Sequence, residues 1–318
     1  MNRPQRGVAL ITVLLVVAIV TVVSAGMIAR QHLAIRASSN QLHAQQALHY
    51  ALGGEILAKS LLQRDRENDA QRLVDHPGEA WAQPRPPFPV DHGEIHLHIE
   101  DLAGRFNLNS LMRSQQPNEA AIAQFRRLLA RLDIEAPYPE RLLDWLDPDQ
   151  DPSGAYGAED NAYLLLDPPY RTGGRRLYDV SELRLLLDMT EEHYQRLAPH
   201  VAALPADVAL NLNSAGALVI ASLDDDISLA AAEAAVRDRP ARGHAHMAAF
   251  LAQPALAGTE LKGTELAVNS QFFQATSEVQ LGDRRQVLVS LLKRETDGSV
   301  RVLQRHLGQP ARLSREGN

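Results

Sequence analysis

The chain contains no cysteine, and its acidic residues outnumber its basic ones. Without cysteine, disulfide bonds and thiolate metal ligands are excluded, but an exported protein can fold without disulfides, so the compartment stays open. The 39 Asp and Glu against 32 Lys and Arg give a net charge of -7, which disfavours a nucleic-acid partner. The 318 residues suffice for one membrane segment and one or two domains.

Familiar catalytic motifs are also missing. The sequence has no Gly-x-Ser-x-Gly elbow, His-Glu-x-x-His helix, phosphate-binding loop or dinucleotide fingerprint, and the lack of cysteine removes thiol nucleophiles. No nucleophile and base can be paired from the sequence. We therefore expect a protein that is not an enzyme, and a membrane-tethered periplasmic enzyme is the alternative.

Residues 8–29 form an uncharged, mostly apolar run. As a helix rising about 1.5 Å per residue, these 22 residues reach the roughly 30 Å of a bilayer core. Arg3 and Arg6 precede the run, so the positive-inside rule keeps the short N-terminus in the cytoplasm. This pattern predicts a single-pass membrane protein whose short N-terminus stays in the cytoplasm and whose remaining chain lies across the membrane.

A secretory signal cut after Ala25 is the alternative interpretation of this run. The run is longer than an ordinary signal core, and no proline interrupts the chain from Val8 to about Arg64. Apolar residues continue at helical spacing beyond it, at Leu48, Leu52, Ile56 and Leu61. We therefore expect one helix over residues 8–65, whose first part spans the membrane.

Residues 6–15, with the sequence Arg-Gly-Val-Ala-Leu-Ile-Thr-Val-Leu-Leu, resemble a prepilin leader and the start of a pilin helix. The resemblance implies that prepilin peptidase cuts between Gly7 and Val8, which makes residues 1–7 the leader. Most pilins carry Glu at the fifth mature position, whereas this chain has Thr12. In having an uncharged fifth residue, the chain resembles the K-type minor pseudopilin of type II secretion. That subunit lies at the pseudopilus tip, where no subunit above it offers a terminal amine for a carboxylate to pair with. An unpaired carboxylate in hydrocarbon is costly, and a Thr hydroxyl can bond the helix backbone instead.

A loop and a strand follow the predicted helix. Five prolines between residues 77 and 89 predict the loop. Residues 94–100 then alternate polar and apolar side chains, as in a half-buried strand that carries His96 and His98 on its polar face. Two such histidines could hold a metal, but an exposed strand face produces the same spacing and no third ligand is evident nearby.

Residues 111–266 show helical periodicity, with helix-initiating turns at Pro117-Asn118 and Thr190-Glu191. Strand patterns return afterwards, over residues 270–281, 286–293 and 300–306, joined by Gly282-Asp283 and by the hairpin signal Asp297-Gly298. A strand before a helical block and strands after it indicate that the block is inserted into a small domain, whose sheet the N-terminal helix covers.

K-type pseudopilins look like this arrangement, and the resemblance includes residues 100–109, 175–183 and 210–215. The predicted fold class is therefore α+β, with a type IV pilin-like long N-terminal helix packed on an antiparallel sheet and a large inserted all-α domain. The pilin-like domain is expected over residues 66–110 and 267–318, and the inserted domain over residues 111–266.

Residues 210–215, Leu-Asn-Leu-Asn-Ser-Ala, also resemble the opening of helix-hairpin-helix, or SAM-like, modules. DNA-binding versions offer backbone N–H groups of the hairpin to phosphate. Here the hairpin would be residues 223–227, whose three consecutive aspartates repel phosphate. We expect a scaffold in which Asn213 or Ser214 caps a helix, and no bound nucleic acid. A membrane-anchored DNA receptor is the alternative.

An acidic loop lies inside the helical block. From residue 144 to residue 160 it has no Lys or Arg and six acids, which are Asp144, Asp147, Asp149, Asp151, Glu159 and Asp160. Crowded carboxylates repel one another, and Ca²⁺, which takes six to eight oxygen ligands, relieves that repulsion. The spacing begins like an EF-hand but departs from it at Pro152 and Ala158.

K-type pseudopilins bind calcium through a similar loop, so the resemblance implies calcium as a cofactor. A solvated acidic loop is the alternative. We expect Asp144 to lie at the end of the preceding helix. Asp179 is considered as a more distant contributor to the calcium site. The ligand candidates are Asp147, Asp149, Asp151, Glu159 and Asp160.

The function implied by the resemblance is that of a minor pseudopilin at the pseudopilus tip, which starts or caps assembly and supports exoprotein export across the outer membrane. The expected partners are the minor pseudopilins of types I and J, the major pseudopilin of type G, prepilin peptidase, and secreted exoproteins or the secretin.

Overall fold

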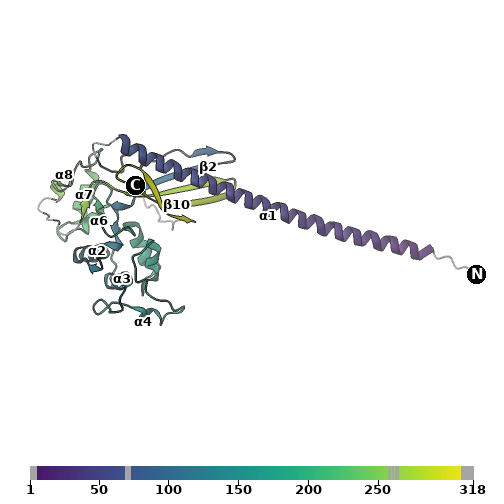
Figure 1. The fold of residues 1–318 in the computed structure, drawn as a ribbon, viewed down its shortest axis with the longest axis horizontal. Coiled ribbons are helices and arrows are strands. Elements are labelled where there is room, and N and C mark those ends of the chain that lie inside the picture. Colours follow the sequence, from purple (N-terminus) through teal and green to yellow (C-terminus); the bar gives the residue numbers. More distant parts are fainter. Residues whose placement is uncertain (1–5, 69–72, 257–258, 260, 262–264, 309–318) are drawn as a thin grey trace, which may run out of the picture.

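The computed structural model describes residues 6–68, 73–256, 259, 261 and 265–308. A single long helix projects from a body, and a lobe of short helices hangs from one side of that body (Figure 1). This helix, α1 (Arg6–Asn68), has 63 residues and a length of about 95 Å. It begins two residues before the predicted start at Val8 and ends three residues after the predicted end.

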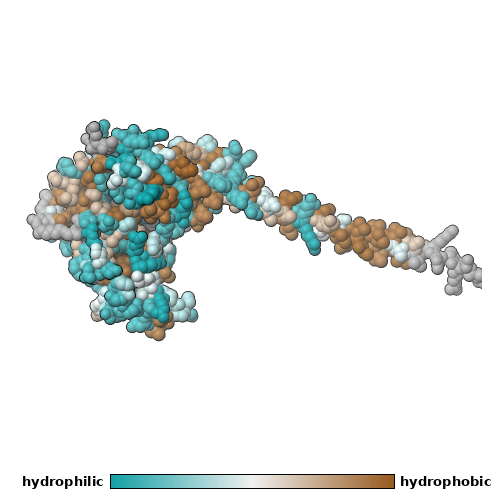
Figure 2. All heavy atoms as spheres, in the orientation of Figure 1, coloured by the Kyte–Doolittle hydropathy of each residue, from teal (hydrophilic) through white to brown (hydrophobic). Residues whose placement is uncertain are grey.

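The two halves of α1 have different surroundings. Side chains from Ala9 onward are exposed through the first half, and Figure 2 shows this part as mainly apolar. The second half lies on the sheet, where Ala51, Ala58 and Leu62 are buried completely. Small side chains on that face bring the helix axis close to the strands, and the buried apolar area stabilises the contact.

Gly54 marks the closest approach of α1 to the sheet. A Cβ atom at this position would lie 2.1 Å from Ser277 Oγ, whereas a Cβ atom at neighbouring Gly53 would meet nothing within 4 Å. The two glycines therefore differ in role, since only Gly54 is required by packing. The next residue, Glu55, is also buried, and its carboxylate accepts hydrogen bonds from Ser290 Oγ at 2.6 Å and from Arg305 Nε at 2.7 Å.

The body is a five-stranded antiparallel sheet in the order β1-β2-β9-β10-β11. Its strands are β1 (Phe88–Val90), β2 (Gly93–Asp101), β9 (Phe272–Leu281), β10 (Arg284–Arg294) and β11 (Val300–Leu307). The strands predicted over residues 94–100, 270–281, 286–293 and 300–306 are confirmed within a few residues, as is the alternation that buries Ile95, Leu97 and Ile99 in β2. The predicted loop over residues 77–89 is confirmed except at its end, where β1 begins.

The lobe contains more than helices, so the prediction of an all-α block is wrong in detail. Its helices are α2 (Glu119–Arg131), α3 (Tyr138–Leu146), α4 (Asp160–Tyr163), α5 (Glu191–Leu197), α6 (Ala217–Ala221), α7 (Leu229–Arg237) and α8 (Met247–Leu251). Turns of 3₁₀ helix are η1 (Leu102–Gly104), η2 (Leu108–Leu111), η3 (Val180–Leu185), η4 (Ala198–His200) and η5 (Pro254–Leu256). Two-residue strands are β3 (Phe106–Asn107), β4 (Met112–Arg113), β5 (Gln116–Pro117), β6 (Val201–Ala202), β7 (Leu210–Asn211) and β8 (Leu266–Ala267).

Frequent proline explains why these helices are short. Eleven of the 18 prolines fall between residues 111 and 266, and proline ends a helix because it lacks an N–H donor and clashes with the preceding turn. The predicted helix starts are confirmed, since Asn118 and Thr190 cap α2 and α5 with their side chains.

Parallel two-residue pairings tie the lobe together, β3 with β6 and β7 with β8. Within β7, Asn211 Nδ2 donates to Asp101 Oδ2 at 2.7 Å and to the backbone oxygen of Asp75 at 3.0 Å. Asn213 bonds the backbone of His244 and Val268. These asparagines therefore cross-link segments of the fold, and the prediction that Asn213 or Ser214 caps a helix is wrong, because Gly216 is the N-cap of α6.

Candidate functional site

Three carboxylates meet where the acidic loop leaves α3. One oxygen each of Asp144, Asp147 and Glu159 lies within 4.8 Å of the other two. Asp144 is in the last turn of α3, Asp147 is the C-cap of that helix, and Glu159 is the N-cap of α4. We call this group the loop cluster.

Asp144 and Glu159 of the loop cluster are buried, Asp147 is half-buried, and the acidic loop around them has no Lys or Arg. Asp144 is 0% exposed and Glu159 is 2% exposed. Within the part of the chain that the structure describes, both Glu159 oxygens, Asp144 Oδ2 and Asp147 Oδ1 have no hydrogen-bond partner. Asp144 Oδ1 accepts one bond, from the Ser153 backbone N–H at 2.8 Å. A buried carboxylate that lacks donors is costly, so the geometry suits a cation.

Titration of the loop cluster reflects this crowding. Burial, followed by the charges of Asp144, Asp147 and their neighbours, raises the pKa of Glu159 to about 8. Burial also raises the pKa of Asp147 to about 6, with added repulsion from Asp149 and Asp144. A divalent cation would reverse both effects, because an adjacent positive charge favours the ionised carboxylate.

Of the five predicted ligands, the structure brings two, Asp147 and Glu159, together in the loop cluster. Asp149 and Asp151 are exposed, and Asp149 Oδ1 accepts from the Asp151 backbone N–H at 2.9 Å. Asp160 turns away to pair with Arg171 and to accept from the Thr172 backbone N–H at 3.0 Å.

Asp144 is the member that sequence reasoning set aside. It does lie in the preceding helix, as predicted, but its side chain points into the cluster. Its spacing of three residues from Asp147 was an available signal, since such residues share one helix face. Asp179, predicted as a remote contributor, instead caps η3 and lies 3.5 Å from His306 Nε2.

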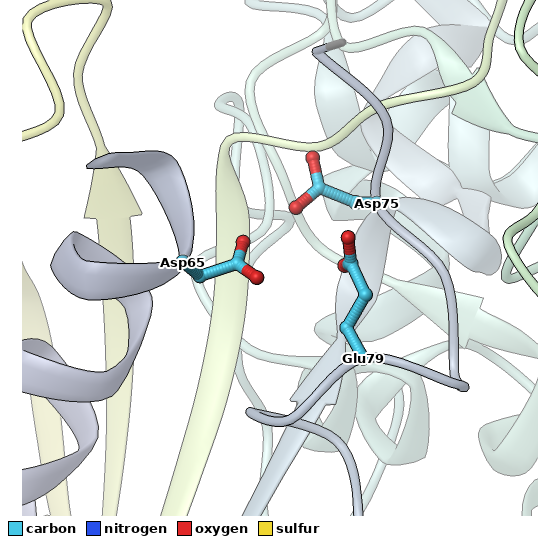
Figure 3. A group of neighbouring side chains, drawn as sticks. All are labelled: Asp65, Asp75 and Glu79. Atoms are coloured by element: carbon cyan, nitrogen blue, oxygen red, sulfur yellow. The ribbon is translucent and has the colours of Figure 1, made fainter. Parts of the chain in front are cut away.

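A second acidic group, Asp65, Asp75 and Glu79, lies at the C-terminal end of α1, and we call it the helix-end cluster. Figure 3 shows the three carboxylates pointing toward one another, Asp65 from the helix and the other two from the chain that follows. Arg294 supplies its positive charge. The guanidinium contacts Asp75, lies 3.0 Å from Asp65 Oδ2, and donates to the Ser270 backbone oxygen at 3.1 Å.

Glu79, the third member of the helix-end cluster, accepts hydrogen bonds from groups other than Arg294. Its Oε2 atom accepts from Trp81 Nε1 at 2.7 Å and from the His76 backbone N–H at 3.1 Å. Burial, followed by repulsion from Asp65, raises the pKa of Glu79 to about 8 in spite of these donors. With Arg294 among them, these carboxylates form an internal ion-pair network.

At the membrane end, α1 is the one candidate membrane span within the described residues. The Thr12 hydroxyl donates to the Ala9 backbone oxygen at 2.9 Å, as predicted. Gly7 and Val8 lie in the first turn of α1, and residues 1–5 of the predicted leader lie outside the described residues.

The histidine-bearing strand face and the aspartate-rich hairpin, both considered from the sequence as binding sites, are ordinary surface features in the structure. His96 Nε2 lies 2.9 Å from Glu94 Oε1 on the exposed face of β2, and neither belongs to a cluster of three ligands in the described chain. The turn between α6 and α7 carries Asp224, Asp225 and Asp226, as expected, and buries Leu223 and Ile227 on either side.

A membrane-length apolar helix whose second half packs on an antiparallel sheet is the architecture of a pilin-like membrane-anchored subunit. Comparison with known proteins makes the class specific. The family described as "Type II secretion system (T2SS), protein K" matches residues 104–206 and 210–269. The chain is 51% identical over 317 residues to type II secretion system protein K of Pseudomonas aeruginosa, covering 97% of this chain and 95% of that protein.

The protein of the same name from Klebsiella pneumoniae is 39% identical over 327 residues, covering 97% of this chain and 98% of that protein. The chain therefore belongs to the type II secretion system protein K family, and the predicted K-type minor pseudopilin is confirmed. The fold is also similar to a chain in the crystal structure of the GspK-GspI-GspJ complex from enterotoxigenic Escherichia coli, with a TM-score of 0.78 and 29% identity, covering 86% of this chain and 99% of that chain.

Proposed function

We propose that this minor pseudopilin occupies the tip of the pseudopilus, with residues 8–29 in the inner membrane and the body and lobe in the periplasm. The observation that carries the tip position is Thr12, which satisfies its hydroxyl within its own helix at 2.9 Å from the Ala9 oxygen. No carboxylate stands there to require a partner above it. The lobe also projects sideways from α1 (Figure 1), which suits a terminal position better than the interior of a thin fibre.

The proposed partners follow from the similar complex, which contains GspI and GspJ. We propose that α1 packs with minor pseudopilins of types I and J and meets the major type G below them. Prepilin peptidase would remove residues 1–7 by cutting between Gly7 and Val8. Exoproteins or the secretin would meet the periplasmic part. The role is structural, and we propose no catalysis.

We further propose that the loop cluster holds calcium. Asp144, Asp147 and Glu159 would supply the inner carboxylates, and their buried, donorless oxygens support this assignment. Three carboxylates that each bind through one oxygen provide fewer oxygens than a calcium site needs. We therefore keep Asp149, Asp151 and Asp160 as candidates for the additional ligands. Bound calcium would fix the loop between α3 and α4.

For the lobe, we propose the division made from the sequence, with residues 111–266 as the inserted domain. Within it, α6, the aspartate turn and α7 would form a helix-hairpin-helix, or SAM-like, scaffold. The packing of Leu223 and Ile227 inside this unit supports a structural role, and the three aspartates oppose phosphate binding. A gel-shift assay that found salt-sensitive DNA binding by the full chain would contradict this proposal.

Substitution of Thr12 tests the tip position. Thr12→Glu should impair secretion or change pseudopilus length, because the new carboxylate would lie unpaired in the bilayer. Thr12→Val is the matched control and should be tolerated, since it adds no charge. Normal secretion and normal fibres in the Thr12→Glu variant would contradict the tip position.

The N-terminal mass of the mature chain tests the processing step. A chain that begins at Val8 only in cells with prepilin peptidase would establish the cut after Gly7. A chain that begins at Gly26 would mean a cleaved secretory signal, and the membrane-anchored role would have to be abandoned.

A further inference from the structure

An apolar surface lies at the end of the lobe that is farthest from α1. Tyr156, Leu164 and Leu165 are 67%, 45% and 87% exposed, and we call them the lobe-tip surface. The helix between them, α4, marks the far edge of the lobe in Figure 1, and Figure 2 shows apolar atoms at that edge. Single exposed apolar residues are ordinary, but three within ten residues of one loop are a reason to look for a partner.

The exposure of these residues is imposed by the fold. Tyr163, which directly precedes the two leucines, is fully buried and contacts the Trp145 ring edge to face at a centroid distance of 5.5 Å. The Leu187 backbone N–H donates to Tyr163 Oη at 3.2 Å. The buried Tyr163 therefore anchors α4 and holds Leu164 and Leu165 outward, so little conformational entropy would be lost when they bind.

The segment that carries the lobe-tip surface is acidic, and the carboxylates of Asp149, Asp151 and Asp167 are exposed on it. Residues 142–170 contain seven acidic residues and no Lys or Arg. A calcium ion in the loop cluster would cancel two of these charges and leave the region acidic. Of the arginines that follow in the chain, Arg171, Arg175 and Arg184 are paired with carboxylates, Arg171 with Asp160 of this segment, and Arg176 is exposed.

From the exposed leucines, their rigid support and the acidic surroundings, we propose that the lobe-tip surface docks a protein that presents an apolar edge flanked by Lys or Arg. Opposite charge favours such a partner by steering and by excluding acidic surfaces. Phospholipid surfaces, whose phosphates are anionic, fit this charge poorly. The inference goes beyond the proposed function, and it rests on that function only in placing the lobe outside the membrane.

Short peptides test the chemistry directly on the full chain held in phosphatidylcholine nanodiscs. The probes are a Leu/Lys peptide, a Leu/Glu peptide and a Ser/Lys peptide, with empty nanodiscs as the baseline. The Leu/Lys peptide should bind most tightly, and the Leu164→Ser, Leu165→Ser double variant should weaken that binding by about tenfold or more, the loss expected when buried leucine contacts disappear. Leu303→Ser, at a leucine 49% exposed on β11, is the matched control and should change nothing.

Other results would overturn the proposal. Equal binding of the Leu/Glu peptide would remove the charge argument, and unchanged Leu/Lys binding in the double variant would remove the site. Loss of binding to phosphatidylglycerol vesicles in the same variant, without loss of peptide binding, would assign the surface to lipid.

A measurement in cells separates docking from assembly. The double variant should still enter the pseudopilus at the wild-type level while secretion falls by about tenfold or more, and Leu303→Ser should leave both unchanged. If the double variant fails to enter the pseudopilus although it is stably produced, the surface serves assembly and the docking proposal is overturned. If even the wild-type chain is absent from pseudopili, the proposed function fails, and the peptide measurement still decides the docking surface.

Discussion

The loop cluster and the helix-end cluster contain the same kind of groups in opposite electrostatic settings. Each brings three carboxylate oxygens within 4.8 Å of one another. At the helix end, Arg294 contacts two of the three carboxylates, and Trp81 and the His76 backbone donate to the third. In the loop cluster, both Glu159 oxygens are buried without a hydrogen-bond partner among the described residues.

Carboxylate proximity alone therefore does not define a metal site. Arg294 already gives the helix-end cluster a positive charge through its ion pairs with Asp65 and Asp75, so this cluster acts as an internal brace between α1 and β10. The loop cluster has the same repulsion with no such cation among the described residues. Calcium in the loop cluster would supply the positive charge that Arg294 supplies in the helix-end cluster.

Removal of Arg294 should have the largest effect on stability. Arg294→Met leaves the buried Asp75 without its charged partner, so the free energy of unfolding should fall by about 3–5 kcal/mol, measured by chemical denaturation of the full chain in detergent. Arg301→Met is the control. Its side chain is 68% exposed and paired with Glu295, and loss of a surface pair costs about 0–1 kcal/mol.

The Arg294→Met variant also tests whether Arg294 keeps a divalent cation out of the helix-end cluster. If Arg294 is what keeps a divalent cation out, calcium should restore part of the stability that Arg294→Met loses. A variant as stable as the wild-type chain would mean that the helix-end cluster does not depend on Arg294.

Glu159→Gln should have the next largest effect, in the loop cluster. Calcium at about 100 times its dissociation constant should stabilise the wild-type chain by about 2.7 kcal/mol, seen as a higher melting temperature that a chelator reverses. The variant should lose this gain because it lacks one inner ligand. Without calcium it should melt no lower than the wild-type chain, since the substitution relieves repulsion. A full calcium response in Glu159→Gln would contradict the assignment.

The pH dependence of the calcium response should be smaller but has a definite sign. Burial raises the pKa of Glu159 to about 8 and that of Asp147 to about 6, so protons compete with calcium below these values. The melting-temperature gain from calcium should therefore grow between pH 6 and pH 8.

Without calcium the trend runs the other way. Carboxyls with raised pKa values in the folded chain stabilise it at low pH, and this stability is lost as pH rises toward about 8. Glu79, whose pKa is also about 8, adds to the calcium-free trend from the helix-end cluster. The gain from calcium isolates the loop cluster, and a gain that shrinks from pH 6 to pH 8 would argue against carboxylate ligands there.

Asp149→Asn combined with Asp151→Asn should have the smallest effect. Both side chains are exposed, so their removal should weaken calcium binding less than Asp144→Asn, which alters a buried ligand. Calcium titration of the two variants compares them. If the exposed pair matters more, the ligand set is the one indicated by spacing in the sequence.

Periodicity in the sequence was enough to predict α1 and the strands of the sheet, because a residue's spacing from its chain neighbours decides these elements. Thr12 bonding to its own helix is likewise local, and it was predicted correctly. The lobe was harder, since its short helices and the β3–β6 and β7–β8 pairings depend on contacts between distant segments.

The same limit applies to the two clusters. Asp147 and Glu159 were predicted from the acidic loop, and Asp144 could have been added from its position one helical turn before Asp147. The helix-end cluster was not predicted at all, because Asp75 and Arg294 are 219 residues apart in the sequence. No local sequence pattern predicts which group of acidic residues a distant arginine will contact.

Calcium binding at the loop cluster is measured by calorimetric titration of the full chain, with Asp144→Asn and Asp65→Asn as the paired variants. We expect saturable binding that Asp144→Asn abolishes and Asp65→Asn preserves. Absence of binding to the wild-type chain, or loss of binding in Asp65→Asn alone, would contradict this expectation.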